Sequence, residues 1–137
     1  MPTYLLDSNI LSDIVRNPQG ASSRTFGRRA FEPDAELITS IIVACEMRFG
    51  VAKKGSTSLA QRVERVLASV AVMPLASGAD AAYATLRADL ESRGQPIGQN
   101  DMLIAAHALA LGAILVTDNT REFKRIKGLR VENWLRP

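Results

Sequence analysis

Four acidic residues lie within or directly beside apolar segments of the sequence, where charged side chains are uncommon. Asp7 follows a short apolar run near the N-terminus, and Asp118 lies just beyond another such run. Asp101 opens an almost entirely apolar segment, and Glu46 lies near the middle of a third apolar stretch. Because buried strands and helices form a core, carboxylates at their ends are placed at its rim, where a ligand can reach them.

Carboxylate oxygens without a histidine or cysteine cluster are the ligand set that Mg²⁺ and Mn²⁺ prefer. Two carboxylates about 4 Å apart repel each other by roughly 4 kcal/mol at an effective dielectric constant near 20, so such a cluster needs a cation or a proton. A bound cation of this kind activates water and stabilises the leaving oxygen in phosphodiester hydrolysis. The pattern is compatible with one ion or with two.

Each acid also has an individual structural explanation. Asp7 or Asp118 could cap the helix that follows it, Asp101 would suit the positive end of any helix, and Glu46 could face solvent. These explanations weaken jointly, because they need independent reasons for acids at the ends of two apolar strands and at the start of a buried helix. Five further acids are interpreted as solvated: Asp13, Glu64, Asp89, Glu91 and Glu122.

Other polar residues near the acids are less specific. Asn9 and Thr117 could hold a metal-bound water or a phosphate, and they could equally be caps, so both interpretations stay open. His107, the only histidine, lies among alanines and leucines, and we interpret it as a partly buried, hydrogen-bonded residue. Cys45, the only cysteine, is interpreted as a small core residue.

Strands and helices are expected to alternate along the chain. The predicted strands cover residues 3–6, 37–39, 72–75, 114–116 and 129–131, and the predicted helices cover 10–16, 22–31, 41–53, 59–70, 77–92, 100–111 and 119–124. This alternation predicts an α/β fold with a parallel sheet covered by helices on both faces. The carboxyl ends of such strands share one edge, where ligands bind, and Asp7 and Asp118 both fall there. Asp101 can reach the same edge, whereas Glu46 reaches it only if its helix leans over the site.

Size and composition indicate one domain spanning residues 1–137. The hydrophobic fraction of 47% supports a core, and a single cysteine excludes an internal disulfide or a cysteine zinc site. We find no signal peptide and no apolar run near the roughly 18 residues of a membrane span, so we expect a cytoplasmic protein without a membrane partner. The net charge of +3 is ordinary, but a basic exterior around an acidic pocket would suit a polyanion.

Four segments resemble PIN-domain ribonucleases, and most closely the VapC toxins of bacterial toxin–antitoxin pairs. They are Leu-Leu-Asp-Ser-Asn at 5–9, Ala-Cys-Glu-Met-Arg-Phe-Gly at 44–50, Ile-Gly-Gln-Asn-Asp-Met-Leu-Ile-Ala-Ala-His-Ala at 97–108, and Leu-Val-Thr-Asp-Asn-Thr-Arg-Glu-Phe at 115–123. The resemblance implies a PIN-like three-layer fold whose five parallel strands have the order 3-2-1-4-5. It also implies RNA cleavage dependent on Mg²⁺ or Mn²⁺.

By this resemblance Asp7, Glu46, Asp101 and Asp118 match the four acids of the family, with Asp7 and Asp101 the surest metal ligands. Some relatives carry asparagine in place of Asp118. The resemblance further implies a homodimer, a cognate VapB-type antitoxin whose C-terminal segment blocks the site, and contact with operator DNA only through that antitoxin. The implied substrates are structured RNAs, namely tRNA anticodon loops or an rRNA loop.

Two other functions are compatible with parts of the pattern. In a phosphotransfer domain Asp7 would be the phosphorylated nucleophile, but haloacid-dehalogenase-type enzymes need a second aspartate where this chain has Asn9. A catalytically silent RNA-binding module would use outward cations, with Arg28, Arg29, Arg48, Arg121 and Lys124 as the main candidates, together with Arg24, Lys53, Lys54 and Arg125. Four acids would repel phosphate in such a module unless a metal ion were present.

Overall fold

A five-stranded parallel sheet forms the centre of the molecule, in a computed structural model that describes residues 2–137. The strands are β1 (Thr3–Leu6), β2 (Glu36–Ser40), β3 (Ala71–Met73), β4 (Ile114–Val116) and β5 (Val131–Glu132). Their order is β3-β2-β1-β4-β5, and each neighbouring pair is parallel. The predicted fold class and strand order are therefore confirmed.

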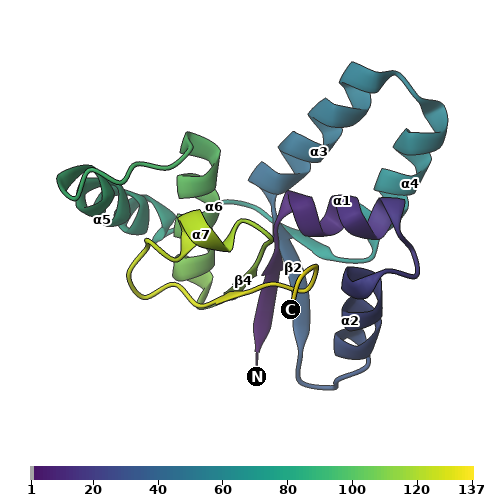
Figure 1. Cartoon of the computed structure of the whole chain (residues 1–137), viewed down its shortest axis with the longest axis horizontal. Coiled ribbons are helices and arrows are strands. Elements are labelled where there is room, and N and C mark those ends of the chain that lie inside the picture. The colour runs from purple at the N-terminus through teal and green to yellow at the C-terminus, as the bar shows by residue number, and fades with distance from the viewer. Residues whose placement is uncertain (1) are drawn as a thin grey trace.

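Seven helices surround this sheet among the described residues. They are α1 (Ser8–Arg16), α2 (Ala21–Ala30), α3 (Ile41–Lys54), α4 (Thr57–Ala68), α5 (Ala79–Ser92), α6 (Gln99–Leu111) and α7 (Thr120–Phe123). Figure 1 shows α5, α6 and α7 on one side of the strands and α1 to α4 on the other. Within residues 2–137, none of these helices combines the length and the apolar character that crossing a bilayer requires.

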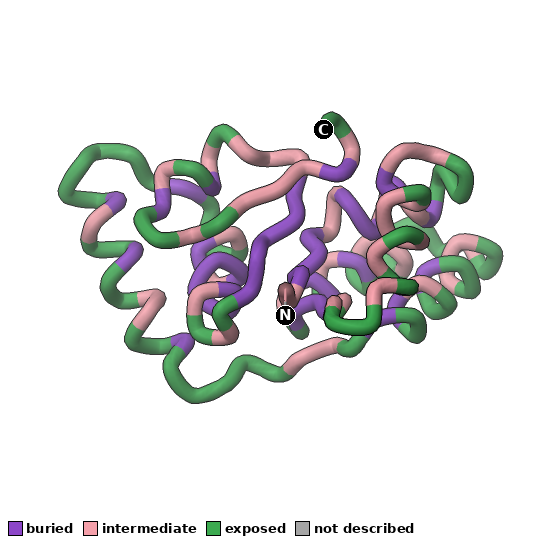
Figure 2. Tube along the Cα trace, turned by 90° about the horizontal axis from the view of Figure 1, so that it is seen from below, coloured by how far each residue is buried: buried purple, intermediate pink, exposed green. Residues whose placement is uncertain are grey.

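The central strands are buried because they are covered on both faces, as continuous apolar runs require. Leu5 and Leu6 of β1 and Leu115 and Val116 of β4 are fully buried. Figure 2 shows this buried centre between more exposed helices. The strand β1 is the central strand of the sheet and pairs with β4. Asp7, which follows β1, therefore lies beside the end of β4, although the two are far apart in the sequence.

Local signals place the ends of the helices that carry the acids. The Ser40 hydroxyl accepts a hydrogen bond from the Ile42 backbone N–H at 3.1 Å, so α3 begins immediately at the carboxyl end of β2. Gly112 ends α6 with a φ of +64°, a conformation that glycine adopts without strain. The Ser40 cap thus starts the helix that carries Glu46 at one edge of the sheet, and Gly112 ends the helix that carries Asp101.

The structure corrects the predicted buried face of α3. Cys45 is exposed, so its interpretation as a core residue is wrong, and Phe49, four residues further along the helix, is 68% exposed. The core side of α3 consists of Val43, Ala44 and Met47. The error has a physical origin, because this helix is apolar around most of its circumference and more than one set of residues follows the helical period.

Asp13 is a second correction, because it is buried and not solvated. Its carboxylate accepts a hydrogen bond from the Asn17 side-chain amide at 2.7 Å, and its backbone carbonyl accepts one from the Asn17 N–H at 2.7 Å. Asp13 therefore stabilises the end of α1. Several boundaries also differ from the prediction. The helix α5 begins at Ala79 after Gly78, β3 ends before Pro74, and β5 covers Val131–Glu132 in place of 129–131.

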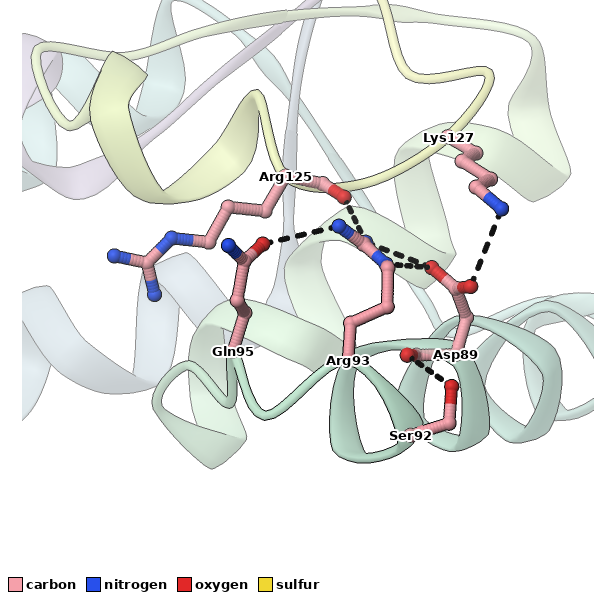
Figure 3. A network of polar contacts seen from close by, with 6 residues as sticks. All are labelled: Asp89, Ser92, Arg93, Gln95, Arg125 and Lys127. Atoms are coloured by element: carbon pink, nitrogen blue, oxygen red, sulfur yellow. Dashed lines mark hydrogen bonds and ion pairs between the residues drawn. The ribbon is translucent and has the colours of Figure 1, made fainter.

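A network of hydrogen bonds and ion pairs centred on Arg93 lies at the start of the loop between α5 and α6 (Figure 3). Arg93 at the end of α5 donates to the Asp89 carboxylate at 2.7 Å, to the Gln95 side chain at 3.0 Å and to the Arg125 carbonyl. Lys127 pairs with the other Asp89 oxygen at 3.4 Å. The network ties the end of α5 to the segment after α7, on either side of the loop that leads to Asp101.

Candidate active site

The structure places all four predicted acids at the carboxyl edge of the sheet. Asp7 directly follows β1 and is only 3% exposed. Asp118 lies just beyond β4, and Asp101 lies in the first turn of α6. Glu46 lies in the second turn of α3, which starts at the end of β2. Glu46 lines the same groove as Ser8, the residue that follows Asp7.

A network of hydrogen bonds holds the Asp7 carboxylate in place. One oxygen accepts from the Ser8 backbone N–H at 2.8 Å, and the other accepts from the Thr117 hydroxyl at 2.8 Å. The Asn9 amide donates to the Thr117 hydroxyl at 3.2 Å, and Asn9 also accepts from the Asp118 N–H at 2.9 Å. Asn9 and Thr117 therefore join the ends of β1 and β4 and orient Asp7 between them.

Three of the acids interact electrostatically across this edge. Burial raises the pKa of Asp7, and burial together with the Asp7 charge raises the pKa of Glu46. Burial and the charges of Asp7, Glu46 and Glu122 raise the pKa of Asp101 to about 6. Like charges have this effect only over short distances, so the three carboxylates belong to one site. The polar side chains of Ser8 and Asn100 oppose the shift at Glu46.

No basic side chain compensates these acids in the described part of the chain. Asp7, Glu46 and Asp101 take part in none of its ion pairs, and one Glu46 oxygen is buried without a hydrogen-bond partner. Oxygen donors with uncompensated charge fit a hard divalent cation. Among residues 2–137, no three Asp, Glu, His or Cys side chains are gathered closely enough to form a ready-made cage for an ion.

Asp118 differs from the other three predicted acids. Its carboxylate accepts from the Asn133 side-chain amide at 3.0 Å and pairs with Arg136 at 3.3 Å. Asp118 does not contribute to the raised pKa of Asp7, Glu46 or Asp101. The side chain is thus directed toward the C-terminal segment and not toward the shared site.

Glu122 is an acid of the site that the sequence analysis placed in solvent. It lies on α7, accepts from the Asn119 side-chain amide at 3.0 Å, and its charge contributes to the raised pKa of Asp101. The spacing contained a signal for this position. Glu122 follows Asn119 by three residues at a predicted helix start, a spacing at which the two side chains can interact in the first turn.

The predicted RNA-binding cations divide into separate locations. Arg48 forms an ion pair with Glu64 that links α3 to α4. Arg28, Arg29 and Lys124 line a single hollow between α2, α7 and the C-terminal segment, and Arg121 is not among its lining residues.

His107 is buried in the core, away from solvent. Its Nδ1 lies 2.8 Å from the Ser40 hydroxyl, the same group that caps α3. Burial lowers the pKa of His107, which favours the neutral ring. The prediction of a hydrogen-bonded structural histidine agrees with this environment.

Comparison with known proteins assigns the family. A model of the PIN domain matches residues 4–129. Ribonuclease VapC2 of Rickettsia felis is 35% identical over 133 residues, which are 96% of this chain and 97% of that protein. The tRNA(fMet)-specific endonuclease VapC of Shigella flexneri is 30% identical over 98% of this chain and 99% of that protein.

Solved structures show the same similarity. VapBC2 from Rickettsia felis, crystallised with a DNA fragment from its promoter, contains a chain with a TM-score of 0.90 and 33% identity that covers 96% of this chain and 98% of its own. DNA-bound VapBC from Salmonella typhimurium contains one with a TM-score of 0.84 and 29% identity, covering 98% of this chain and 99% of its own. The chain belongs to the PIN-domain family, and its relatives are VapC proteins.

Proposed function

We propose that this protein is the endoribonuclease toxin of a toxin–antitoxin pair and that it cuts structured RNA with the help of Mg²⁺ or Mn²⁺. The observation that carries the proposal is the group formed by Asp7, Glu46 and Asp101. The Asp7 charge raises the pKa of Glu46, the charges of Asp7 and Glu46 raise the pKa of Asp101, and none of the three has a basic partner in the described chain. A fold maintains such repulsion when the site has a cationic ligand.

In the proposed mechanism Asp7, Asp101 and Glu46 hold the metal through carboxylate oxygens. A metal ion bound there would lower the pKa of a water molecule and stabilise the leaving oxygen during in-line hydrolysis. Thr117 and Asn9 keep the Asp7 carboxylate oriented, so that its position does not depend on the ligand. Asp118 could join the ligands only by giving up Asn133 and Arg136.

We further propose tRNA, cut in the anticodon region, as the substrate, with an rRNA loop as the alternative. The support is the Shigella flexneri relative named as a tRNA(fMet)-specific endonuclease. The phosphotransfer alternative has less support, because both oxygens of the Asp7 carboxylate already accept hydrogen bonds, from the Ser8 N–H and the Thr117 hydroxyl. An attacking carboxylate oxygen would have to give up one of these partners.

The proposed partner is a VapB-type antitoxin, which would bring the toxin to operator DNA. Related VapBC assemblies were solved on DNA, which supports this partner. A groove of about 340 Å³ between α1, α3 and α4 includes Glu46 in its lining, together with the apolar side chains of Met47, Val51 and Val63. An antitoxin segment in this groove would reach the acids directly. We also propose that the toxin forms a homodimer.

Growth of bacterial cells tests the toxin assignment. Induction of the protein alone should stop growth, whereas the Asp7→Asn variant at the same soluble level should not. Co-expression of the antitoxin encoded beside it should restore growth. Normal growth of cells that contain the soluble wild-type protein without antitoxin would contradict the proposal.

A further inference from the structure

A basic hollow lies beside the acid site, between α2, α7 and the C-terminal segment. Its volume is about 450 Å³, and its lining includes four cationic side chains and one carboxylate. The cations are Arg28, Arg29, Lys124 and Arg136, and the carboxylate is Glu132. Segments from three distant parts of the sequence contribute these charges, so the basic character comes from the fold and not from a single run of basic residues.

Two of the cations are free to bind a ligand. Neither Arg28 nor Lys124 forms an ion pair with any carboxylate in residues 2–137, and both are exposed. Arg28 donates only to the Thr25 hydroxyl, at 3.1 Å. An arginine fork and a lysine ammonium that face one hollow are the groups that proteins use for phosphate oxygens.

The carboxylate of the hollow does not neutralise these two cations. Glu132 accepts a hydrogen bond from the Trp134 indole N–H at 3.1 Å. Arg29 is already paired with Glu32 at 2.8 Å and also lies over the Tyr4 ring. The excess of positive charge therefore rests on Arg28 of α2 and on Lys124 at the end of α7.

The short helix α7 separates the hollow from the acids. Glu122 on α7 acts on Asp101, while Thr120 and Lys124 at its two ends line the hollow. Arg136 of the hollow pairs with Asp118, which follows β4. The short helix α7 and the Asp118–Arg136 ion pair therefore connect the hollow to the edge of the sheet that carries the acids.

We propose that this hollow binds backbone phosphates of the RNA substrate to one side of the bond that is cut. The inference rests on the proposed ribonuclease function and adds the path of the substrate to it. An extended polyanion entering the acid site needs compensating charge beside it, because the carboxylates alone repel phosphate. Thr25 and Thr120 add hydroxyl groups suited to phosphate and ribose oxygens.

Binding of labelled tRNA to full-length protein tests this inference. Asp101→Asn protein without divalent metal serves as the background, so that the RNA stays intact. Adding Arg28→Ala and Lys124→Ala together should weaken binding about tenfold at about 0.1 M salt and reduce the salt slope by about one to two. The matched control is Arg62→Ala with Arg65→Ala, two exposed cations of α4, which should change affinity less than about twofold.

A conservative variant and the control decide the result. Lys124→Arg with Arg28 intact should retain the affinity, because the charge remains in the hollow. Equal losses in both double variants, or no loss in the Arg28/Lys124 pair, would overturn the hollow as a binding site. If the Arg28/Lys124 double variant bound RNA more weakly but metal-loaded wild-type protein cut no RNA, the hollow would be supported as a binding site and the proposed nuclease function would be contradicted. If the wild type cut RNA but the double variant bound it as tightly as the background protein, the nuclease function would be supported and the hollow would be overturned.

Discussion

Asp101 carries the largest electrostatic penalty of the proposed ligands. Its carboxylate lies in the first turn of α6, where the helix dipole favours negative charge, yet its pKa is raised to about 6 by burial and by Asp7, Glu46 and Glu122. Burial and repulsion by the neighbouring carboxylates therefore outweigh the favourable effect of the helix dipole. Without metal, and at a pH between 3.8 and about 6, the Asp101 carboxyl of the folded protein retains a proton that the unfolded chain would release.

The Asp101→Asn variant should be more stable than the wild type in EDTA at neutral pH. The difference between a pKa of about 6 and the ordinary value of 3.8 corresponds to at most about 3 kcal/mol. Water screens the partly exposed carboxylate, so we expect a gain of about 1 kcal/mol. Because the folded-state pKa is raised, the wild type loses stability relative to the variant as pH rises from about 4 to about 6, with little change above 7.

Urea denaturation of both proteins across this pH range measures the effect. Asp80→Asn is a suitable control, since this exposed acid lies in the first turn of α5, away from the site. A constant difference between the wild type and Asp101→Asn at all pH values would show that Asp101 does not share a field with the other acids.

Thr117→Val should misplace Asp7 without removing any acid. The Thr117 hydroxyl is fully buried, donates to Asp7 and accepts from Asn9 and Asn119. We expect a loss of about 1–3 kcal/mol of stability and at least a tenfold loss of RNA cleavage per folded molecule. Thr117→Ser retains the hydroxyl and should recover most of the activity; failure of this rescue would argue against a positioning role.

At the residue scale, sequence reasoning identified the acids better than their surroundings. The rule that parallel strands end at one edge grouped Asp7 with Asp118, and Asp101, at a helix start, was expected to reach the same edge. Glu122 and Arg136 were missed as members of this region, because they lie on a short helix and a terminal segment whose directions no periodicity determines. The orientation of Asp118 toward Asn133 likewise depends on where the C-terminal segment packs.

Among the elements, α3 and α6 are joined by a buried polar contact. His107 of α6 lies 2.8 Å from the Ser40 hydroxyl, and that hydroxyl also caps the start of α3. The two helices carry Asp101 and Glu46, so the contact connects two sides of the acid site. With the hydroxyl accepting from Ile42, its proton is available to His107 Nδ1, which acts as the acceptor in the neutral ring.

Replacement of either partner should weaken this junction of helices. His107→Leu should cost about 1–3 kcal/mol, and Ser40→Ala should add the loss of a helix cap, about 1 kcal/mol. Because both remove one contact, their effects should be non-additive by at least about 0.5 kcal/mol in a double-mutant cycle. Thermal or urea unfolding of the four proteins measures the coupling, and simple additivity would show that the contact contributes no stability.

The elements themselves followed from the sequence with small errors at their ends. Alternation of apolar strands and capped helices predicted all five strands, since each sequence signal acts locally. The exposed face of α3 could not be predicted, because its apolar residues fit more than one helical stripe and tertiary packing selects among them. Pro74 ended β3 earlier than expected, since proline cannot donate to a sheet.

At the scale of the whole molecule, metal and fold stability should be linked. A ligand that binds only the folded state stabilises it by RT ln(1 + [L]/Kd), about 2.7 kcal/mol when its concentration is 100 times the Kd. Mn²⁺ or Mg²⁺ should therefore raise the melting temperature of the wild type. The Asp101→Asn variant should show a much smaller rise, and equal shifts in both proteins would indicate binding elsewhere.

Incubation of purified protein with total tRNA is the most direct test of the central claim that the clustered carboxylates form a metal-dependent nuclease site. Reactions with Mg²⁺ or Mn²⁺ are compared with EDTA and with Asp101→Asn protein, and the fragment ends are mapped by sequencing. We predict discrete cuts by the wild type with metal and loss of these cuts in both controls. Cuts that persist in EDTA, or in the folded Asp101→Asn variant, would contradict the claim.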